Sequence, residues 1–201
     1  MDFQEVVRRR RMVRNYDPSR PIPETVVDRL LANALRAPSA GFSQGWAFLV
    51  LSNPEERDRF WAATTSPDDL ESPDSWLTGM RNAPLLIVPL SHKQAYLDRY
   101  ASPDKGWTDR DEARWPVPYW DIDTGFAALL MLLTAVDEGL GACFFGVPPE
   151  HMDAFRNAFG VPGEYTPIGC VSVGYRAPDR PSPSLRRGHR PTEDVVHRGS
   201  W

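Results

Sequence analysis

The sequence is short of the residues that most often build metal sites and disulfide frameworks. Its 201 residues include only two cysteines and four histidines. The histidines lack metal-ligand spacing with each other or with either cysteine, so no metal site is predicted. Cys143 and Cys170 both lie in apolar stretches. We therefore expect two buried free thiols in a reducing cytoplasm rather than a disulfide.

Several familiar catalytic and targeting signals are also missing. The chain has no Gly-x-Ser-x-Gly elbow, no Walker loop and no Gly-x-Gly-x-x-Gly fingerprint of a separate dinucleotide-binding domain. Residues 1–11 lack the apolar core of a signal peptide, and the most apolar run, 126–136, is too short to cross a bilayer. A net charge of −4 gives no overall attraction to nucleic acid or to an anionic membrane. We expect a soluble cytoplasmic protein.

One short segment nevertheless concentrates positive charge. Residues 8–14 contain five arginines within seven positions: Arg8, Arg9, Arg10, Arg11 and Arg14. The planar guanidinium fork matches the oxygens of a phosphate group. A cationic run also suits the C-terminal end of a solvated helix, which is the simpler interpretation. The loop that follows in the sequence makes a local anion site the better interpretation.

That loop, residues 37–46, reads Ala-Pro-Ser-Ala-Gly-Phe-Ser-Gln-Gly-Trp and lies between a predicted amphipathic helix and a predicted strand. It offers backbone N–H groups, two hydroxyls and a carboxamide within one turn of chain. A flat polar heterocycle needs such partners, because ring edges that are buried without hydrogen bonds reduce affinity. An arginine cluster for a phosphate and a loop for a polar ring together indicate flavin mononucleotide.

In both segments the chain resembles the FMN-dependent nitroreductase family. That family has an early Arg-Arg-x-x-x-Arg-x-(Phe/Tyr) segment and then Ala-Pro-Ser-x-x-x-x-Gln-Pro-Trp. The resemblance extends to the helix near residue 130, the Gly-Leu-Gly turn at 139–141 and the basic tail. It implies one α+β domain over 1–201 with a nitroreductase-like mixed sheet covered by helices. It also implies an intertwined homodimer with FMN at the interface.

The resemblance also implies which residues bind the cofactor, and none is expected to act as an amino-acid catalyst or a metal ligand. Arg10 and Arg11 fall at phosphate-side positions, and Arg14 at the basic position near the pyrimidine edge of the ring. Two positions depart from the family motif: Met12 stands where serine is common and Gly45 where proline is common. Two arginines of the tail, preferably Arg187 and Arg190, would close the phosphate site. The other implied flavin contacts are Met12, Pro38, Ser39, Ala40, Phe42, Gln44, Phe144, Phe145 and Gly146, with the loop residues reaching the flavin of the opposite subunit.

Hydrophobic periodicity and turn signals predict the remaining elements. Helices are expected over 3–10, 24–37, 54–63, 121–138 and 148–159, and strands over 46–51, 84–90, 142–147 and 165–175. Residues 66–75 are expected to form a surface loop and 101–118 a lid-like loop rich in aromatics. The helix near residue 130 is apolar all round, which predicts a subunit interface. The arm from about 177 needs a docking partner to be ordered.

The expected activity is hydride transfer from NADH or NADPH through FMN to a small acceptor such as a nitroaromatic or a quinone. A nicotinamide would visit the flavin and leave before the acceptor enters, and a deazaflavin could replace FMN. One alternative is a flavin-consuming enzyme resembling dimethylbenzimidazole synthase, although that subgroup carries an aspartate where this chain has Met12. Another is a flavin-binding protein without turnover, and a third, disfavoured by the acidic balance, is a module for nucleic acid or protein.

Overall fold

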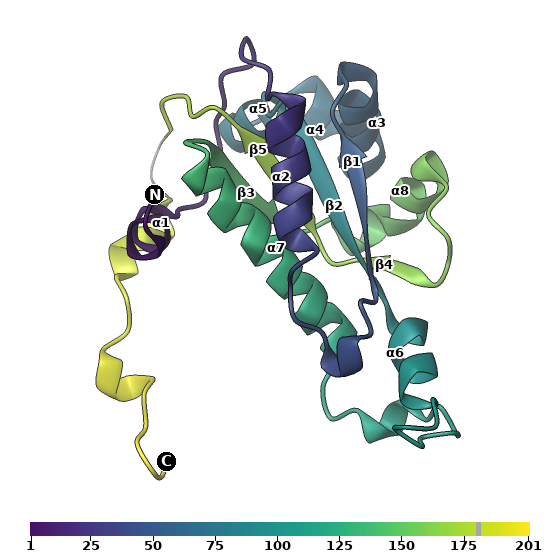
Figure 1. Cartoon of the computed structure of the whole chain (residues 1–201). Coiled ribbons are helices and arrows are strands. Elements are labelled where there is room, and N and C mark those ends of the chain that lie inside the picture. The colour runs from purple at the N-terminus through teal and green to yellow at the C-terminus, as the bar shows by residue number, and fades with distance from the viewer. Residues whose placement is uncertain (180–181) are drawn as a thin grey trace.

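The computed structural model describes residues 1–179 and 182–201 of the chain. Groups of one to three α-helices separate most of the strands along the chain (Figure 1). The strands are β1 (Trp46–Leu51), β2 (Leu85–His92), β3 (Gly141–Phe145), β4 (Tyr165–Pro167) and β5 (Cys170–Gly174). The α-helices are α1 (Phe3–Arg9), α2 (Glu24–Ala34), α3 (Pro54–Thr64), α4 (Pro67–Glu71), α5 (Ser75–Arg81), α6 (Lys93–Tyr100), α7 (Tyr119–Asp137) and α8 (Met152–Phe159).

The strands form one sheet in the order β1-β2-β5-β3, with β4 paired to the end of β2. All of these pairs are antiparallel; for example, Ile87 of β2 lies opposite Val171 of β5. An isolated parallel bridge adds Met12 to the outer edge of β3, beside Ala142. The N-terminal segment therefore extends the sheet next to the strand that carries the predicted flavin contacts.

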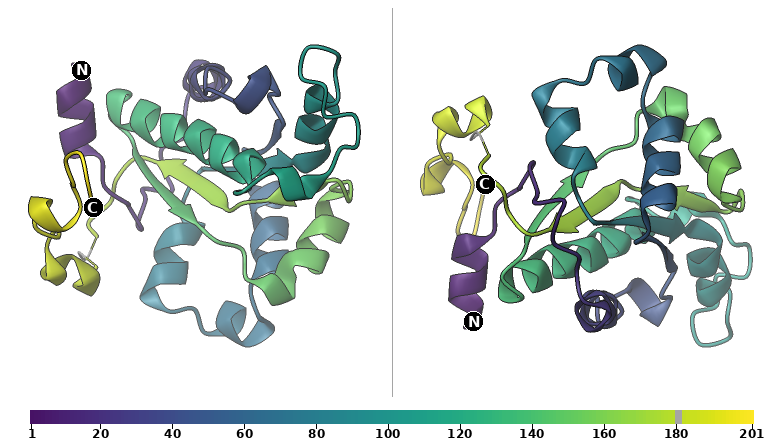
Figure 2. Two further views of the ribbon diagram at one scale, coloured as in Figure 1. Left: turned by 90° about the horizontal axis from the view of Figure 1, so that it is seen from below. Right: turned by 90° about the horizontal axis from the view of Figure 1, so that it is seen from above.

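Helices cover both faces of this sheet (Figure 2). Because successive side chains of a strand point to opposite faces, β2 supplies both hydrophobic cores. Leu85 and Ile87 pack with α2 and α7 on one face, and Leu86 and Val88 pack with α3, α5 and α8 on the other. This double coverage explains why the β2 sequence is apolar at almost every position rather than alternating.

Helix α7 is the longest element and lies against the sheet through a buried face. It is long and apolar enough to cross a membrane by length and composition, but 56% of its most apolar window is buried inside the protein. Such burial is typical of the core helix of a soluble protein. Ile122, Phe126 and Leu129 remain 36%, 43% and 45% exposed. They are spaced i, i+4, i+7 and so form one stripe that this chain leaves uncovered.

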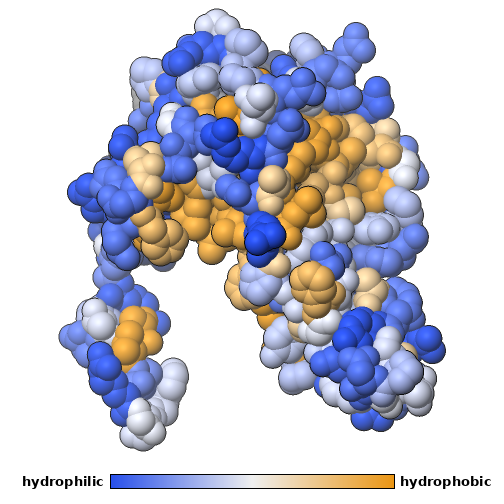
Figure 3. Space-filling model, viewed as in Figure 1, coloured by the Kyte–Doolittle hydropathy of each residue, from blue (hydrophilic) through white to orange (hydrophobic). Residues whose placement is uncertain are grey.

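The C-terminal arm begins beside α1 and then leads away from the body of the protein (Figures 1 and 2). Its apolar side chains lie largely in solvent: Leu185 is 71% exposed and Trp201 is fully exposed. Figure 3 shows a band of apolar surface across α7 and α2, separated from the arm by open space. Among the described residues, neither the apolar side chains of the arm nor the stripe on α7 is covered.

The segment 101–118 folds back onto α6. Tyr100 packs against the indoles of Trp107 and Trp115, with ring centroids 4.9 Å and 4.6 Å apart. Trp115 also meets the rings of Tyr96 and Trp120. The segment is therefore an aromatic cluster rather than an extended loop. Four ion pairs surround it: Lys93–Glu112, Arg99–Asp104, Arg110–Asp98 and Arg114–Asp109.

Most of the predicted elements are confirmed, and three differences are informative. Residues 66–75 are not a plain loop, because Ser66 caps α4 and Asp74 caps α5. The expected strand 165–175 is divided into β4 and β5 around Gly169, whose φ is 154°. Helix α6 was not predicted, since its aromatic residues contact the segment 101–118 and the loop 39–45 instead of forming a regular stripe.

The two thiols should be unreactive in the folded protein. Cys143 and Cys170 are both buried and free, as the sequence predicted, and burial raises the pKa of each thiol. We expect a disulfide-exchange reagent to label neither cysteine at pH 8 in the native state and both after denaturation. Fast labelling of the native protein would contradict the burial of this part of the sheet.

Candidate flavin site

The arginine segment and the predicted flavin strand lie side by side. The Val13 N–H donates to the carbonyl of Ala142 at 3.0 Å, and the Phe144 N–H approaches the Met12 sulfur at 3.4 Å. The side chain of Met12 packs against both hydrophobic cores. Met12 therefore joins the arginine segment to β3, a structural role that a serine at this position would not fill.

Contacts on several sides hold the backbone around Arg14. Its N–H donates to the Asp179 carboxylate at 2.9 Å. The hydroxyl of Tyr16, which is 1% exposed, donates to the carbonyl of Val13 at 2.7 Å and lies 2.8 Å from the Ser172 hydroxyl on β5. On the other side, a Cβ at Gly79 of α5 would lie 2.2 Å from the Arg14 carbonyl oxygen. The segment thus lies between β5 and α5, with little freedom to shift.

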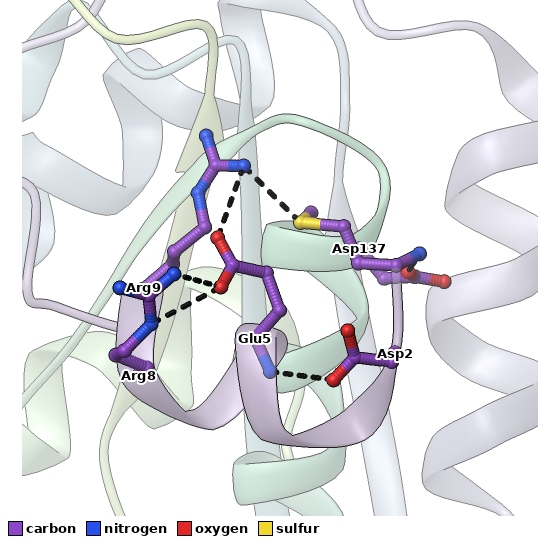
Figure 4. A network of polar contacts seen from close by, with 6 residues as sticks. Asp2, Glu5, Arg8, Arg9 and Asp137 are labelled. Carbon is purple, nitrogen blue, oxygen red and sulfur yellow. Dashed lines mark hydrogen bonds and ion pairs between the residues drawn. The ribbon is translucent and has the colours of Figure 1, made fainter.

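The five arginines are not equivalent. Figure 4 shows Arg8 and Arg9 turned back along α1 toward Glu5, with which both form ion pairs. Arg10 lies at the C-terminal end of α1, where it is partly buried, and Arg11 is exposed just beyond it. No ion pair of Arg10 or Arg11 is found among residues 1–179 and 182–201, so these two are the better candidates for an external anion.

Arg176 is a further member of this cationic cluster that the sequence analysis missed. Its side chain lies against Gly141 at the start of β3, where a Cβ would be 2.8 Å from the arginine Cγ. Partial burial lowers the pKa of Arg176, and the charges of Arg11 and Arg9 lower it further. An anion placed among these guanidinium groups would relieve their mutual repulsion. Arg176 follows the C-terminal end of β5, and its antiparallel bridge with Tyr16 brings it beside the arginine segment.

The other end of β3 opens toward a cavity of about 330 Å³. Phe145 and Gly146 line it, together with Trp61 and Trp76 from the helical layer. The rings of Phe145 and Trp61 stack with centroids 5.6 Å apart and planes 5° apart. A Cβ at Gly146 would meet no atom within 4 Å, so the backbone at this point is open to a planar group.

The loop 38–46 has a tight and unusual backbone. Residues 40–42 form one turn of 3₁₀-helix in which Gly41 has φ 63°, and Phe42 and Gln44 also have positive φ values of 56° and 50°. The Gln44 N–H donates to the Ser39 hydroxyl oxygen at 3.0 Å, and this bond closes the loop. Phe42 is 74% exposed, so its ring projects away from its own chain.

Within one chain this loop is far from the arginine cluster. The Ala40 N–H donates to Asp123 near the start of α7, whereas the N-terminal amine beside α1 pairs with Asp137 at the end of α7. The two anchor points are fourteen helical residues apart, or about 21 Å at 1.5 Å per residue. The structure therefore brings together the predicted contacts of residues 10–14 and 144–146, but not those of 38–44.

The tail arginines lie outside both groups. Arg187 is exposed in the arm, and an Arg190 guanidinium N–H donates to the carbonyl of Asp194, also in the arm, at 3.0 Å. Their assignment to the phosphate stays a prediction.

Solved structures with the same fold define the class of protein first. A "nitroreductase family protein" from Clostridium difficile matches with a TM-score of 0.73 and 22% identity over the whole of both chains. A "putative nitroreductase in complex with FMN" from Exiguobacterium sibiricum also matches with a TM-score of 0.73 and 22% identity, covering 98% of this chain and 97% of that one. The α+β architecture expected from the sequence is confirmed as the nitroreductase fold.

Sequence comparison then identifies the family. The profile described as "Nitroreductase family" matches residues 7–175, so the chain belongs to the nitroreductase family. A relative from Methanothermobacter thermautotrophicus, named "Putative NADH dehydrogenase/NAD(P)H nitroreductase", is 26% identical over all of this chain and 88% of its own length. A relative of the same name from Archaeoglobus fulgidus is 28% identical over 96% of this chain and 94% of its own. The family assignment supports an oxidoreductase.

Tyr16 provides a test of the anchoring geometry. Tyr16→Phe should lower the free energy of unfolding by about 1–2 kcal/mol, because the Ser172 hydroxyl and the Val13 carbonyl lose their buried partner. Tyr175→Phe is the matched control, since the ring that Arg20 covers at 3.5 Å is retained. Urea unfolding of both variants measures the difference. Equal stability of the two variants would contradict the anchoring role.

Proposed function

We propose that this protein is a homodimeric FMN-dependent oxidoreductase with two flavin sites, each built from both subunits. The observation that carries the proposal is the separation of the two candidate half-sites at opposite ends of α7. In one chain the loop and the N-terminus are attached to α7 at residues fourteen positions apart, so we assign the two halves of each flavin site to different chains. A flavin can then touch the arginine segment and β3 of one chain together with residues 38–44 of a second chain packed on the exposed stripe of α7.

The residues present fit FMN. Arg10 and Arg11 are without an internal partner among the described residues and would hold the phosphate, with Arg176 close enough to share its charge. Arg14 would lie at the pyrimidine edge, where a cation stabilises the negative charge of a reduced ring. The open backbone at Gly146 would admit the ring face. The bound cofactor would supply two-electron hydride chemistry, and the protein's part is to bind and orient it.

The partner chain would complete the site and cover the apolar surface. Ser39, Ala40 and Phe42 would reach the flavin from the second subunit, which agrees with the outward direction of Phe42. The arm from 182 would embrace the partner and bring Arg187 and Arg190 to the phosphate. Burial of its exposed leucine, valines and tryptophan would offset the entropy lost on ordering the arm.

NADH or NADPH is the proposed reductant, and a nitroaromatic or quinone the proposed acceptor class, in a cytoplasmic setting. The relatives' names mention NADH and NAD(P)H, which supports a nicotinamide as reductant. The aromatic segment 101–118 would form a wall of the acceptor pocket. The visible spectrum of the protein with FMN, before and after NADPH or NADH without oxygen, tests this. Bleaching of the yellow colour supports a working oxidoreductase, whereas colourless protein that cannot be loaded would overturn the proposal.

The arginines allow a direct test of the phosphate site. Arg11→Gln should weaken FMN binding by about 10- to 100-fold, because one charge-assisted contact is lost. Arg8→Gln is the control, since Arg8 is committed to Glu5 on α1 and should leave affinity unchanged within about twofold. Flavin fluorescence titration measures both. Equal affinities for FMN would show that the phosphate binds elsewhere.

The exposed stripe of α7 allows a test of the dimer. Leu129→Asp should convert the dimer to a monomer in sedimentation and abolish FMN binding with it, because a charge would be buried in the apolar interface. Glu55→Gln, at an exposed position of α3, is the control and should sediment as the wild type does. A wild-type protein that is monomeric while holding FMN would contradict the shared site.

A further inference from the structure

Asp123 is a buried acidic residue that the sequence did not predict as part of the flavin site. It lies in the second turn of α7 and is 3% exposed. One of its oxygens accepts two hydrogen bonds, from the Ala40 N–H at 2.8 Å and from the Tyr96 hydroxyl at 2.9 Å. A buried carboxylate is costly unless it is hydrogen-bonded, so both donors are needed to keep it in place. The carboxylate in turn connects α7 and α6 to the loop 39–44.

The loop that it holds is under backbone strain. Phe42 and Gln44 adopt positive φ values of 56° and 50°, a region that residues with a Cβ adopt at a cost. Such conformations persist only where surrounding contacts hold them. The Asp123 carboxylate supplies one of these contacts at the first residue of the turn, Ala40.

Helix α6 packs directly against the same loop. A Cβ at Gly45 would lie 2.4 Å from the Tyr96 ring, and a Cβ at Gly41 would lie 2.7 Å from the Tyr100 ring. The Arg99 Nε–H donates to the Gly41 carbonyl at 2.9 Å. The loop is therefore in direct contact with three side chains of one helical face, and Tyr96 is the one that also bonds to Asp123.

We infer that Asp123 is a positioning residue for the flavin site of the partner subunit. Together with Tyr96, it holds Ala40 so that residues 39–42 keep the conformation that meets the ring. This inference rests on the proposed function, since it takes the loop 38–44 as a flavin contact. It adds to that function a buried carboxylate that touches neither cofactor nor substrate and acts through the loop.

Variants at Asp123 separate this role from general stability. Asp123→Ala should weaken FMN binding at least about tenfold, because the Ala40 N–H loses its acceptor and the strained turn relaxes. Asp123→Asn keeps an oxygen acceptor and should restore affinity to within about threefold of the wild type. Thr124→Val is the matched control, since Thr124 is the next residue, is fully buried, and donates its hydroxyl hydrogen bond to the Trp120 carbonyl within α7.

Hydrogen exchange of the loop, followed without flavin, gives a readout that does not depend on activity. Amides of residues 40–44 should exchange at least about tenfold faster in Asp123→Ala than in Thr124→Val, while amides of β2 stay protected in both. Should Asp123→Ala fail to fold, Tyr96→Phe replaces it and should give a smaller shift of about threefold in exchange and affinity. Tyr96→Phe keeps the aromatic ring beside Gly45 but removes the hydroxyl that donates to Asp123.

The outcomes separate the inference from the function on which it rests. Wild-type protein that binds no FMN overturns the proposed function, and the inference with it. If the wild type binds FMN but Asp123→Ala binds it equally tightly, the inference alone is overturned. The same holds if Thr124→Val loses as much FMN affinity as Asp123→Ala does.

Mixed dimers test whether Asp123 acts on the partner's site. A dimer of one Asp123→Ala subunit and one Arg11→Gln subunit should have one tight FMN site, since both substitutions then fall in the other site. Mixed dimers without a tight site overturn the assignment to the partner's flavin.

Discussion

The length of α7 sets the arrangement of the whole molecule. Its second turn holds the loop through Asp123, and its last turn contacts the N-terminus through Asp137, so these two attachment points lie about 21 Å apart along the helix. The stripe of Ile122, Phe126 and Leu129 between them is uncovered. Helix α7 therefore lies between the loop and the N-terminal segment and exposes an apolar stripe. In the proposed dimer, the second chain would cover this stripe.

The sequence predicts what local chemistry dictates and misses what only tertiary contacts create. The arginine segment, the loop 37–46 and the apolar strand β2 were found because each is defined by its own residues. Helix α6 was missed because its aromatic residues pack on the loop 39–45 and on the segment 101–118, which removes the regular apolar period. Arg176 was missed because it joins the cationic cluster only when the end of β5 lies beside the Tyr16 segment.

The two departures from the family motif have structural compensation. At position 45, proline would place carbon atoms where the Tyr96 ring lies, since even a Cβ would be 2.4 Å away. Glycine and tyrosine are therefore a matched pair, and the freedom that glycine adds to the turn is removed by the bonds to Asp123 and Ser39. Met12 forms no polar contact for a phosphate but packs against β3 through its thioether. Neither departure by itself argues against a flavin site.

The support of the loop also connects it to the segment that would face the acceptor. Trp115 packs on both Tyr96 and Tyr100, the two rings that lie under Gly45 and Gly41. Three of the four surrounding ion pairs are exposed and each contributes little, whereas Arg99 is half-buried and also binds the Gly41 carbonyl, so the aromatic cluster and Arg99 supply most of the stiffness. A substitution in the segment 101–118 that displaces Trp115 would therefore also displace the loop 39–45, because the rings of Tyr96 and Tyr100 contact both. If the proposed acceptor pocket is correct, a substitution in its wall would have to keep those two rings in place for the loop to retain its conformation.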